Sequence, residues 1–454
     1  MAVRLVVICR EIMDGTVERY LSLLRQGLWG AGGRPSAGPV VPVGEKAGEN
    51  LMAQPVEGEM QQKMESVMRK VGEEEFAVAQ QQSTTGLVIR FSEEEQYQNE
   101  LLFLRYKWHM HVAVLAEVKA KLAGAGIPFV LLKGLGCDHY YPEYGLRNLG
   151  DIDIYVGEEN YGRAAEVFGC DAAASRSPKH FSVTVQDVTV EVHRTCEILP
   201  SRRANRHFRR LAAEGLFLGP AAEYRTGSDA PATSNGSAAE ADSASGSVSS
   251  SADSGSAAEG AAAGINILNI GGVEVRTPQD DFNAIYLFVH FFDHFLGGGC
   301  GLRQVCDWAL FLHARRDSLD RNYLASALEA LGLTNAWRTF GALAVRHLGL
   351  PAGSLPCSGL PDAGQSPLPR CQARRADRLL RVMLEMGNFG KIRKQERRRR
   401  FGTGFLSRKL GSLLGALHHS FEMLTLFPGH SLRGISHTLV NSTARSLRQL
   451  FSRG

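Results

Sequence analysis

Two aspartates stand one residue apart in the segment RNLGDIDIYV, residues 147–156, which otherwise has the composition of a β-strand. Strands disfavour aspartate, and like charges on one face of a strand repel each other. Alternate side chains of a strand share a face, so Asp151, Asp153 and Tyr155 are expected on one side and the apolar residues on the other. Most Asp-x-Asp pairs are simply solvated at a sheet edge, and a functional interpretation therefore needs support from elsewhere in the chain.

A second strand-like segment, VTVEVH at residues 188–193, supplies a third acid. Its alternation places Glu191 and His193 on one face and the valines on the other. If the two strands are neighbours, Asp151, Asp153 and Glu191 converge, and such a cluster requires a cation beside it. Carboxylate oxygens, together with the phosphates of a substrate, suit the hard cation Mg²⁺, with Mn²⁺ as the alternative. Two such ions can activate a nucleophile and stabilise a pyrophosphate leaving group in an in-line phosphoryl transfer.

The predicted elements follow the order of a mixed α/β core and then helices. Up to residue 227, the pattern predicts a helix within 1–30, a long amphipathic helix at 93–126, strands at 127–134 and 151–156, a helix at 161–169, and a strand pair at 182–194 that turns near Gln186 and Asp187. Later segments predict a strand at 273–278 and helices at 279–296, 301–315, 321–331, 334–348 and 376–386. We therefore expect an α/β (α+β) core with a mixed sheet, followed by a mostly helical domain.

A change of composition divides the chain. Residues 228–264 are almost entirely Ser, Ala and Gly, with a few acids and no basic residue, so they cannot bury a core and are expected to form a disordered insert. The chain then falls into an N-terminal helical or loosely ordered region (1–92), the α/β core (93–227), the insert (228–264), a return strand with the helical domain (265–390) and a basic helical tail (391–454).

Bulk properties set limits on the class of protein. The 454 residues are 44% hydrophobic and carry a net charge of +4, which indicates a globular protein and does not by itself imply a nucleic-acid partner. The eight cysteines are scattered without a CxxC pair, which favours a reducing, cytoplasmic setting over a disulfide framework. The apolar run at the N-terminus is too short for a signal peptide, and no stretch approaches the roughly 20 apolar residues of a membrane span.

Several motifs in a fixed order make the region from roughly residue 95 to residue 390 similar to a known family. The segment GIPFVLLKGLGCDHYYPEYGLRNLGDIDIYV resembles the core of the uncharacterised nucleotidyltransferase family within the DNA polymerase beta-like superfamily, with its Lys-Gly, Tyr-Pro, Arg and Asp-x-Asp. Downstream, VEVHR resembles the third-carboxylate strand of that family. The segment LFVHFFDHFLGGGCGLRQVCDWALFL resembles its helical region, and GNFG at 387–390 resembles a late element.

The resemblance implies transfer of a nucleoside monophosphate from an NTP to an acceptor, with release of pyrophosphate. The acceptor would be a protein, a small molecule or RNA. In this comparison Asp151 and Asp153 match the metal-binding pair, and Glu191 matches the third carboxylate. Lys133 and Gly134 stand on the turn that touches nucleotide phosphates, where the wider superfamily usually has Gly-Ser. A lysine there supplies a point charge for a triphosphate.

Three side chains near these motifs each have alternative interpretations. Lys133 lies in VLLKG like a kinase strand lysine, but no Gly-rich loop precedes it and no HRD or DFG motif follows, which leaves a phosphate contact or a surface lysine. Arg147 either contacts a substrate phosphate or forms a salt bridge with an acid of the cluster. His193 either orients a metal ligand or binds substrate, or it is a hydrogen-bonded structural residue.

Two spaced pairs in the helical region are also ambiguous. His290 and His294 lie one helical turn apart, which suits a transition metal, yet no third ligand is evident, so a cavity lining or a helix interface is favoured. Arg303 and Asp307 have the spacing of an intrahelical ion pair, or their helix face closes the active cleft. The basic run at 391–400 is typical of a solvated helix face, with a nucleic-acid or acidic-membrane contact as the alternative.

Two other classes of function compete with the enzyme. One is a nucleotide-binding or scaffold protein that has lost catalysis, against which the complete set of Asp151, Asp153 and Glu191 argues. The other is an accessory protein that binds nucleic acid or a membrane surface through its basic tail. Salt-dependent binding that requires residues 391–400 but not the carboxylates would favour this second class.

Replacing residues 228–264 with a short Gly-Ser linker should leave the melting temperature within a few degrees, because the segment lacks core-forming side chains. Differential scanning fluorimetry of the full-length and shortened chains measures this. A collapse of solubility or a large fall in melting temperature would show that the insert is structured.

Overall fold

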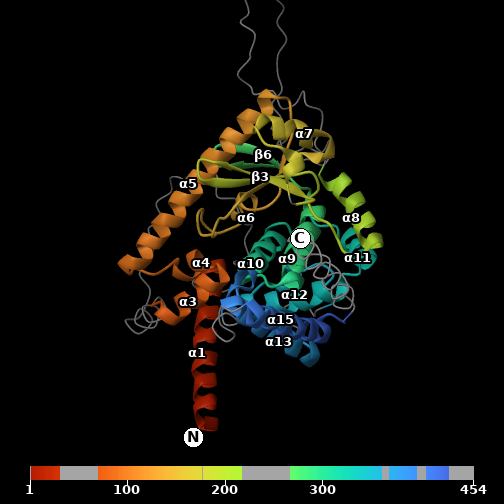
Figure 1. The fold of residues 1–454 in the computed structure, drawn as a ribbon. Coiled ribbons are helices and arrows are strands. Elements are labelled where there is room, and N and C mark those ends of the chain that lie inside the picture. The colour runs from red at the N-terminus through yellow and green to blue at the C-terminus, as the bar shows by residue number, and fades with distance from the viewer. Residues whose placement is uncertain are drawn as a thin grey trace, which may run out of the picture.

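The computed structural model describes residues 2–30, 70–175, 177–216, 266–359, 368–395 and 405–428. A sheet with helices α5 (Glu95–Gly124) and α7 (Gly157–Val167) occupies one end of the molecule, and a larger set of helices occupies the other (Figure 1). The predicted insert at 228–264 and parts of the basic tail lie outside the described residues.

Four short strands form a mixed sheet in the order β1-β2-β4-β3. β1 (Val130–Leu131) is antiparallel to β2 (Ile152–Tyr155), β2 is parallel to β4 (Val188–His193), and β4 is antiparallel to β3 (His180–Val185). The strand predicted at 127–134 is reduced to two residues, although its apolar side chains are buried. Pro128 has no N–H to donate at one end, and the chain turns at Gly134 at the other, so the ladder with β2 stays short.

A two-residue turn joins β3 to β4. Gln186 and Asp187 both have positive φ, 46° and 66°, as in the type I′ turns that suit the twist of a hairpin. The predicted turn at these residues is confirmed. The register that it sets places His180 opposite His193 and Ser182 opposite Glu191.

The apolar face of the sheet is buried with side chains of α5 and α7. Ile152, Ile154 and Val156 are fully buried there, beside Val190 and Val192 of the parallel neighbour. The predicted apolar positions of α5 are buried at Leu101, Leu104, Trp108, Leu115 and Val118 and half-buried at Val112. Burying each large aliphatic side chain stabilises the fold by roughly 1.5–3 kcal/mol, so this face fixes the strand alternation and leaves the acids on the opposite face.

A second, two-stranded sheet is formed by β5 (Asn266–Ile270) and β6 (Val273–Thr277), which are antiparallel. β6 lies beside β1 of the main sheet. The strand predicted at 273–278 is confirmed. The sequence pattern does not predict β5, because Asn266 and Asn269 interrupt its apolar residues.

The second part of the chain is helical, as the sequence predicts. The predicted helices correspond to α9 (Asp280–Gly297), α10 (Leu302–Ala314), α11 (Arg321–Leu331), α12 (Thr334–Leu348) and α13 (Arg370–Met386). Aromatic side chains that include Phe288, Trp308 and Trp337 pack together in their core. No described helix has both the length and the apolarity needed to cross a bilayer.

Further helices come from the start and the end of the chain and from short connecting segments. They are α1 (Ala2–Trp29), α3 (Glu73–Gln82), α4 (Thr85–Ile89), α8 (Arg202–Gly215) and α15 (Phe405–Leu426). The helix expected within residues 1–30 has 28 residues. It packs on the helical domain, where the indole N–H of Trp29 donates to the carbonyl oxygen of Leu348 at 2.6 Å.

Part of the basic run 391–400 is held by ion pairs within the molecule. Arg393 donates from Nη2 to Glu422 of α15 at 2.8 Å and to Glu385 of α13 at 2.9 Å. These contacts tie Arg393 to neighbouring helices, so it is not simply a residue of a solvated helix face.

A buried ion pair joins the loop before β2 to α10. Arg147 donates from Nε to Asp307 Oδ1 at 2.9 Å and from Nη2 to Oδ2 at 2.8 Å, and the hydroxyl of Tyr141 donates to Oδ1 at 2.7 Å. Burial lowers the pKa of Arg147, but the charge of Asp307 and the hydrogen bonds to it together raise the pKa overall. Of the two interpretations of Arg303 and Asp307, the intrahelical ion pair is not the one formed: Asp307 is engaged by Arg147 and Tyr141, and Arg303 donates to the carbonyl oxygen of Asn148.

Removing one partner of the Arg147–Asp307 pair should be strongly destabilising, because the other charge is left buried and unpaired. We expect Arg147→Met and Asp307→Leu each to lower the free energy of unfolding by about 3–5 kcal/mol, and the double variant to lose less than the sum. Urea denaturation measures these values.

The matched control is the exposed pair of Arg346 and Asp377, which meet at 2.6 Å with side chains 42% and 40% exposed. Arg346→Met should cost at most about 1 kcal/mol. Equal losses in the free energy of unfolding for Arg147→Met and Arg346→Met would contradict the view that the buried pair stabilises the fold more than an exposed one.

Candidate active site

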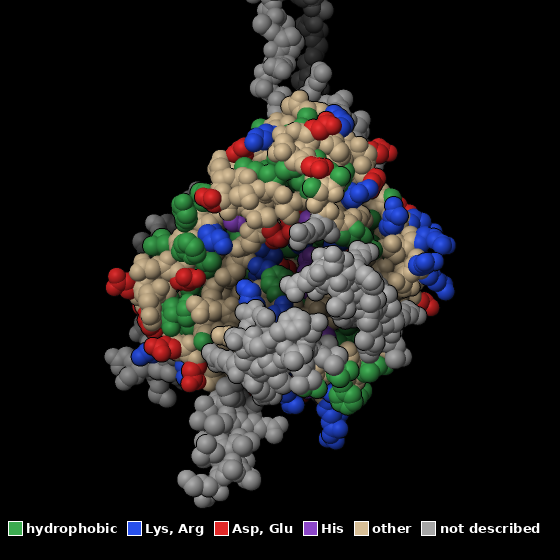
Figure 2. All heavy atoms as spheres, in the orientation of Figure 1, with side chains coloured by type: hydrophobic (Ala, Val, Ile, Leu, Met, Phe, Trp, Pro, Cys, Tyr) green, Lys and Arg blue, Asp and Glu red, His purple; other side chains and the backbone are tan. Residues whose placement is uncertain are grey.

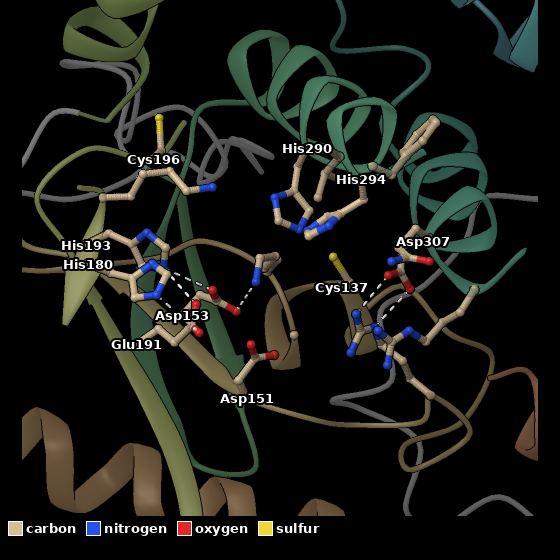
Figure 3. Close-up of a pocket in the computed structure, with 18 of the residues that line it drawn as sticks. Cys137, Asp151, Asp153, His180, Glu191, His193, Cys196, His290, His294 and Asp307 are labelled. Carbon is tan, nitrogen blue, oxygen red and sulfur yellow. Dashed lines mark hydrogen bonds and ion pairs between the residues drawn. The ribbon is translucent and has the colours of Figure 1, made fainter. Parts of the chain in front are cut away.

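A cavity of about 330 Å³ lies between the polar face of the sheet and helices α9 and α10. In the space-filling view, basic, acidic and histidine side chains meet in a hollow near the centre of the molecule (Figure 2). The predicted site residues Lys133, Gly134, Arg147, Asp151, Asp153, Glu191 and His193 all line it, together with His290, His294, Arg303 and Asp307. Figure 3 shows this arrangement in detail.

Three carboxylates converge on the sheet wall of the cavity. β2 and β4 run parallel with Asp153 opposite Glu191, and Asp151 immediately precedes β2. One oxygen from each of these side chains lies within 4.8 Å of the others. Asp153 is fully buried, whereas Asp151 and Glu191 are half-buried. The structure therefore brings together the three acids that strand alternation singles out.

Asp153 is held by two side chains of the chain itself, an ammonium and an imidazole. The ammonium of Lys133 forms an ion pair with Oδ2, and Nε2 of His193 lies 3.1 Å from Oδ1. Burial would raise the pKa of Asp153, but the charge of Lys133 and the hydrogen bond from His193 lower it well below its ordinary value. Burial lowers the pKa of Lys133 and of His193, and the neighbouring carboxylates raise both above their ordinary values. Lys133 is thus a member of a charged network and not a surface lysine.

Gly134 lies between β1 and α6 (Leu135–Asp138) and lets the chain turn beside the start of β2. Its φ is 69°, in the region that favours glycine, and an added Cβ would lie 3.0 Å from the carbonyl oxygen of Asp151. The turn leads into the short helix α6. A larger residue at this position would push the Lys133 turn away from the strand that carries Asp153.

His180 lines the same cavity but is absent from the residues that the sequence singles out. Its Nε2 lies 3.4 Å from Glu191 Oε1, while Nε2 of His193 lies 3.5 Å from Oε2 of the same carboxylate. The three side chains form a second group whose possible ligand atoms lie within 4.8 Å of one another. The predicted strand starts at residue 182 and so omits His180, although the alternation in HFSVTV was available as a signal.

Glu197 links the loop after β4 to α9, and the sequence pattern does not point to it either. It is 2% exposed, accepts a hydrogen bond from Lys179 at 2.7 Å and lies 3.2 Å from Nδ1 of His290. Burial alone would raise the pKa of Glu197, but the hydrogen bond from His290 and the charge of Lys179 lower it to about 2. The surrounding segment RTCEILPS has no helical or strand periodicity that would mark this acid.

His290 and His294 lie one turn apart on α9, with ring centroids 4.6 Å apart. Both line the cavity, so the interpretation that they form a cavity wall is confirmed. Burial lowers the pKa of His294 to about 4. Within the described ranges, neither histidine belongs to a group of three side chains spaced to hold a metal ion.

Arg147, in the loop before β2, and Arg303, on α10, both bring positive charge to the cavity. The salt bridge of Arg147 is made with Asp307 of α10, and not with an acid of the carboxylate cluster. The Nε of Arg303 is buried and has no hydrogen-bond partner among the residues that the structure describes. Burial and the charge of Arg147 lower the pKa of Arg303.

A family model described as "Uncharacterised nucleotidyltransferase" matches residues 81–218 and 252–349, which together are just over half of the chain. No curated protein and no solved structure matches the chain. The first matched range contains the carboxylate cluster with Lys133 and His193, and the second contains His290 and Asp307. The chain therefore belongs to this family of uncharacterised nucleotidyltransferases.

Proposed function

We propose that the protein is a metal-dependent nucleotidyltransferase that moves a nucleoside monophosphate from an NTP to an acceptor and releases pyrophosphate. The observation that carries the proposal is the convergence of Asp151, Asp153 and Glu191, with oxygens within 4.8 Å, on the wall of a cavity. Membership of the family supports the general reaction. The acceptor is a protein, a small molecule or RNA.

The donor set fits Mg²⁺ or Mn²⁺. All three side chains offer carboxylate oxygens, which hard divalent cations prefer. Oδ2 of Asp153 is buried and ion-paired with the ammonium of Lys133, so a divalent cation at this oxygen would take the place of a positive charge that the site already holds. When bound, the cation would supply charge stabilisation to the reacting phosphate oxygens.

Lys133 and Arg303 are suited to the charge of a triphosphate. Lys133 balances Asp153, and a divalent cation held by the carboxylates would release its ammonium for a phosphate oxygen. Arg303 has an unpartnered Nε among the described residues and offers planar donors from α10. Gly134 lets the backbone approach a phosphate closely, because no side chain covers the turn.

His193 and Arg147 act on the site through other residues in this proposal. His193 holds the carboxylate of Asp153 at 3.1 Å, which fixes the orientation of a proposed metal ligand. Two donors of Arg147 are taken by Asp307, so Arg147 contributes its charge to the cavity and positions the loop before Asp151.

The proposed setting is the cytoplasm. The described cysteines, which include the buried Cys137, Cys196, Cys300 and Cys306, are free, and free thiols fit a reducing compartment. A weak contact of the basic run 391–400 with an acidic surface also stays a proposal.

Asp151→Asn should abolish transfer while the fold survives, because it removes a cation ligand without changing the volume of the side chain. We expect a loss of at least about 10²-fold, or roughly 2.7 kcal/mol of transition-state stabilisation. The assay incubates the protein with each NTP, radiolabelled at the α-phosphate, Mg²⁺ or Mn²⁺ and a cell lysate, and follows label transfer and pyrophosphate. The control is Asp187→Asn in the exposed β3–β4 turn. Wild-type rates in Asp151→Asn would remove the carboxylate from the mechanism.

Glu191→Gln should also lower turnover by about 10²-fold, since it keeps size and hydrogen bonding but removes one charge from the proposed cation site. The metal-free melting temperature should not fall, because three crowded carboxylates repel one another. Turnover and thermal unfolding of the same variant separate the two roles of Glu191. Normal turnover with a lowered melting temperature would make it a structural residue and leave only the aspartate pair in the site.

A further inference from the structure

Glu197 is an ionised, buried carboxylate that the proposed metal site does not use. Its oxygens are shared between Lys179 at 2.7 Å and His290 at 3.2 Å, and the backbone N–H of Ile198 donates to Oε1 at 3.2 Å. A buried acid with this many donors is fixed in position, so it can orient the side chains that it contacts.

The contact with Glu197 determines which nitrogen of His290 carries the proton. An ionised carboxylate can only accept hydrogen bonds, so Nδ1 of His290 must be the donor. In the neutral ring the lone pair then lies on Nε2. This nitrogen has no hydrogen-bond partner in the part of the chain that the structure describes, and the ring lines the cavity.

His290 has a carboxylate partner that fixes its tautomer, and its neighbour His294 has none among the described residues. Figure 3 shows both rings projecting from the same helix toward the side of the cavity that carries Asp153 and Glu191. Their ring centroids are 4.6 Å apart, but only His290 is paired with a carboxylate among the described residues. His294 is therefore a control for His290, because its imidazole lines the same cavity without a carboxylate partner among the described residues.

The groups around His290 keep its ring neutral. Titratable or charged groups face the ring of His290 from three places. Glu197, Lys179 and Cys196 lie near the β3–β4 hairpin, and Lys133 and Asp153 lie on the sheet wall. Tyr286 and His294 lie on α9 itself. Burial lowers the pKa of His290, Lys133 lowers it further, and Glu197 raises it by a smaller amount. The net pKa lies below its ordinary value, so the ring can accept a proton at neutral pH.

We propose that His290, held by Glu197, is the general base that removes the proton from a hydroxyl group of the acceptor. This inference rests on the proposed nucleotidyl transfer and restricts the acceptor to a molecule that presents a hydroxyl group to the cavity. His290 is then a catalytic residue, and Glu197 is a positioning residue that acts through it.

The proposed step balances without a further co-reactant. The O–H bond of the acceptor breaks, and its proton moves to Nε2 of His290. The acceptor oxygen forms a bond to the α-phosphorus of the NTP, and the bond from that phosphorus to the bridging oxygen breaks with its electron pair. Pyrophosphate leaves, and the imidazolium afterwards returns its proton to solvent.

The carboxylates of the sheet wall are less suited to this role. Although Asp153 is buried, Lys133 and His193 hold its pKa well below its ordinary value, which makes it a weak proton acceptor. The lone pairs of the cluster are also required by the proposed cation. General-base catalysis is most efficient when the pKa of the base lies near the working pH, and a neutral imidazole meets this condition better.

The first test compares His290→Ala with His294→Ala in the labelled-NTP assay with a cell lysate, between about pH 5.5 and pH 9. His290→Ala should lose about 10²-fold or more in kcat and should lose the acidic limb of the pH profile. His294→Ala should keep that limb. Added imidazole should restore part of the rate in His290→Ala alone, and imidazoles of higher pKa should restore more.

The second test uses Glu197→Gln, which keeps the size of the side chain and removes its charge. Without the carboxylate the pKa of His290 falls, so the acidic limb should move to lower pH and the plateau rate should fall as well. An acidic limb at the same pH as in the wild-type protein would overturn the coupling of Glu197 to the base.

Calorimetry with Mg²⁺ and the α,β-methylene analogue of the NTP that supports transfer separates a general base from a nucleotide ligand. A base that acts on the acceptor predicts wild-type affinity in His290→Ala, and in His290→Gln if the alanine variant does not fold. Affinity lost to the same extent as in Lys133→Ala would make His290 a nucleotide ligand and overturn the inference.

An unchanged pH profile of His290→Ala without imidazole rescue, while Asp151→Asn is inactive, would overturn the inference and leave the proposed function intact. Absence of transfer by the wild-type protein would overturn both.

Discussion

The ion pair between Arg147 and Asp307 holds the two walls of the cavity together. Arg147 belongs to the loop that delivers Asp151 to the sheet, and Asp307 lies on α10 one turn from Arg303. Both charges are buried and joined by two parallel hydrogen bonds, so neither wall can move away without leaving an unpaired charge. This contact therefore helps to fix the position of the carboxylates relative to the helical wall, together with the bond from Arg303 to Asn148 and the pair of Glu197 and His290.

Within that frame, acids and cations alternate across the cavity. One chain of contacts runs along the sheet through Lys133, Asp153, His193, Glu191 and His180, and another joins Lys179, Glu197 and His290. Each buried carboxylate shares its charge with at least one cationic or donor group, so the network can assemble without a metal ion. This is how Asp153, buried in the middle of a strand, becomes compatible with a folded sheet.

The sequence predicts the features that follow from local periodicity. Strand alternation identifies Asp151, Asp153 and Glu191, because burial of the valines and isoleucines leaves only one face for the acids. It does not identify Glu197, which lies in a loop without a period. The partner of Arg147 is 160 residues away, and helical spacing offers an ion pair with Arg303 as one interpretation of Asp307 instead. Tertiary contacts of this kind override a local preference, because the buried fork-to-fork pair is stronger than an i,i+4 pair.

The β3–β4 hairpin affects the order in which the site assembles. Its two-residue turn makes it local in sequence, and hairpins of this kind form within about 1–10 μs. Pairing of β2 with β4 is parallel and joins distant parts of the chain, so it belongs to the slower steps set by contact order. Glu191 and His180 are thus neighbours before Asp153 reaches them. Because the complete cation site exists only after the last strand docks, a metal ion would stabilise the finished fold without accelerating its nucleation.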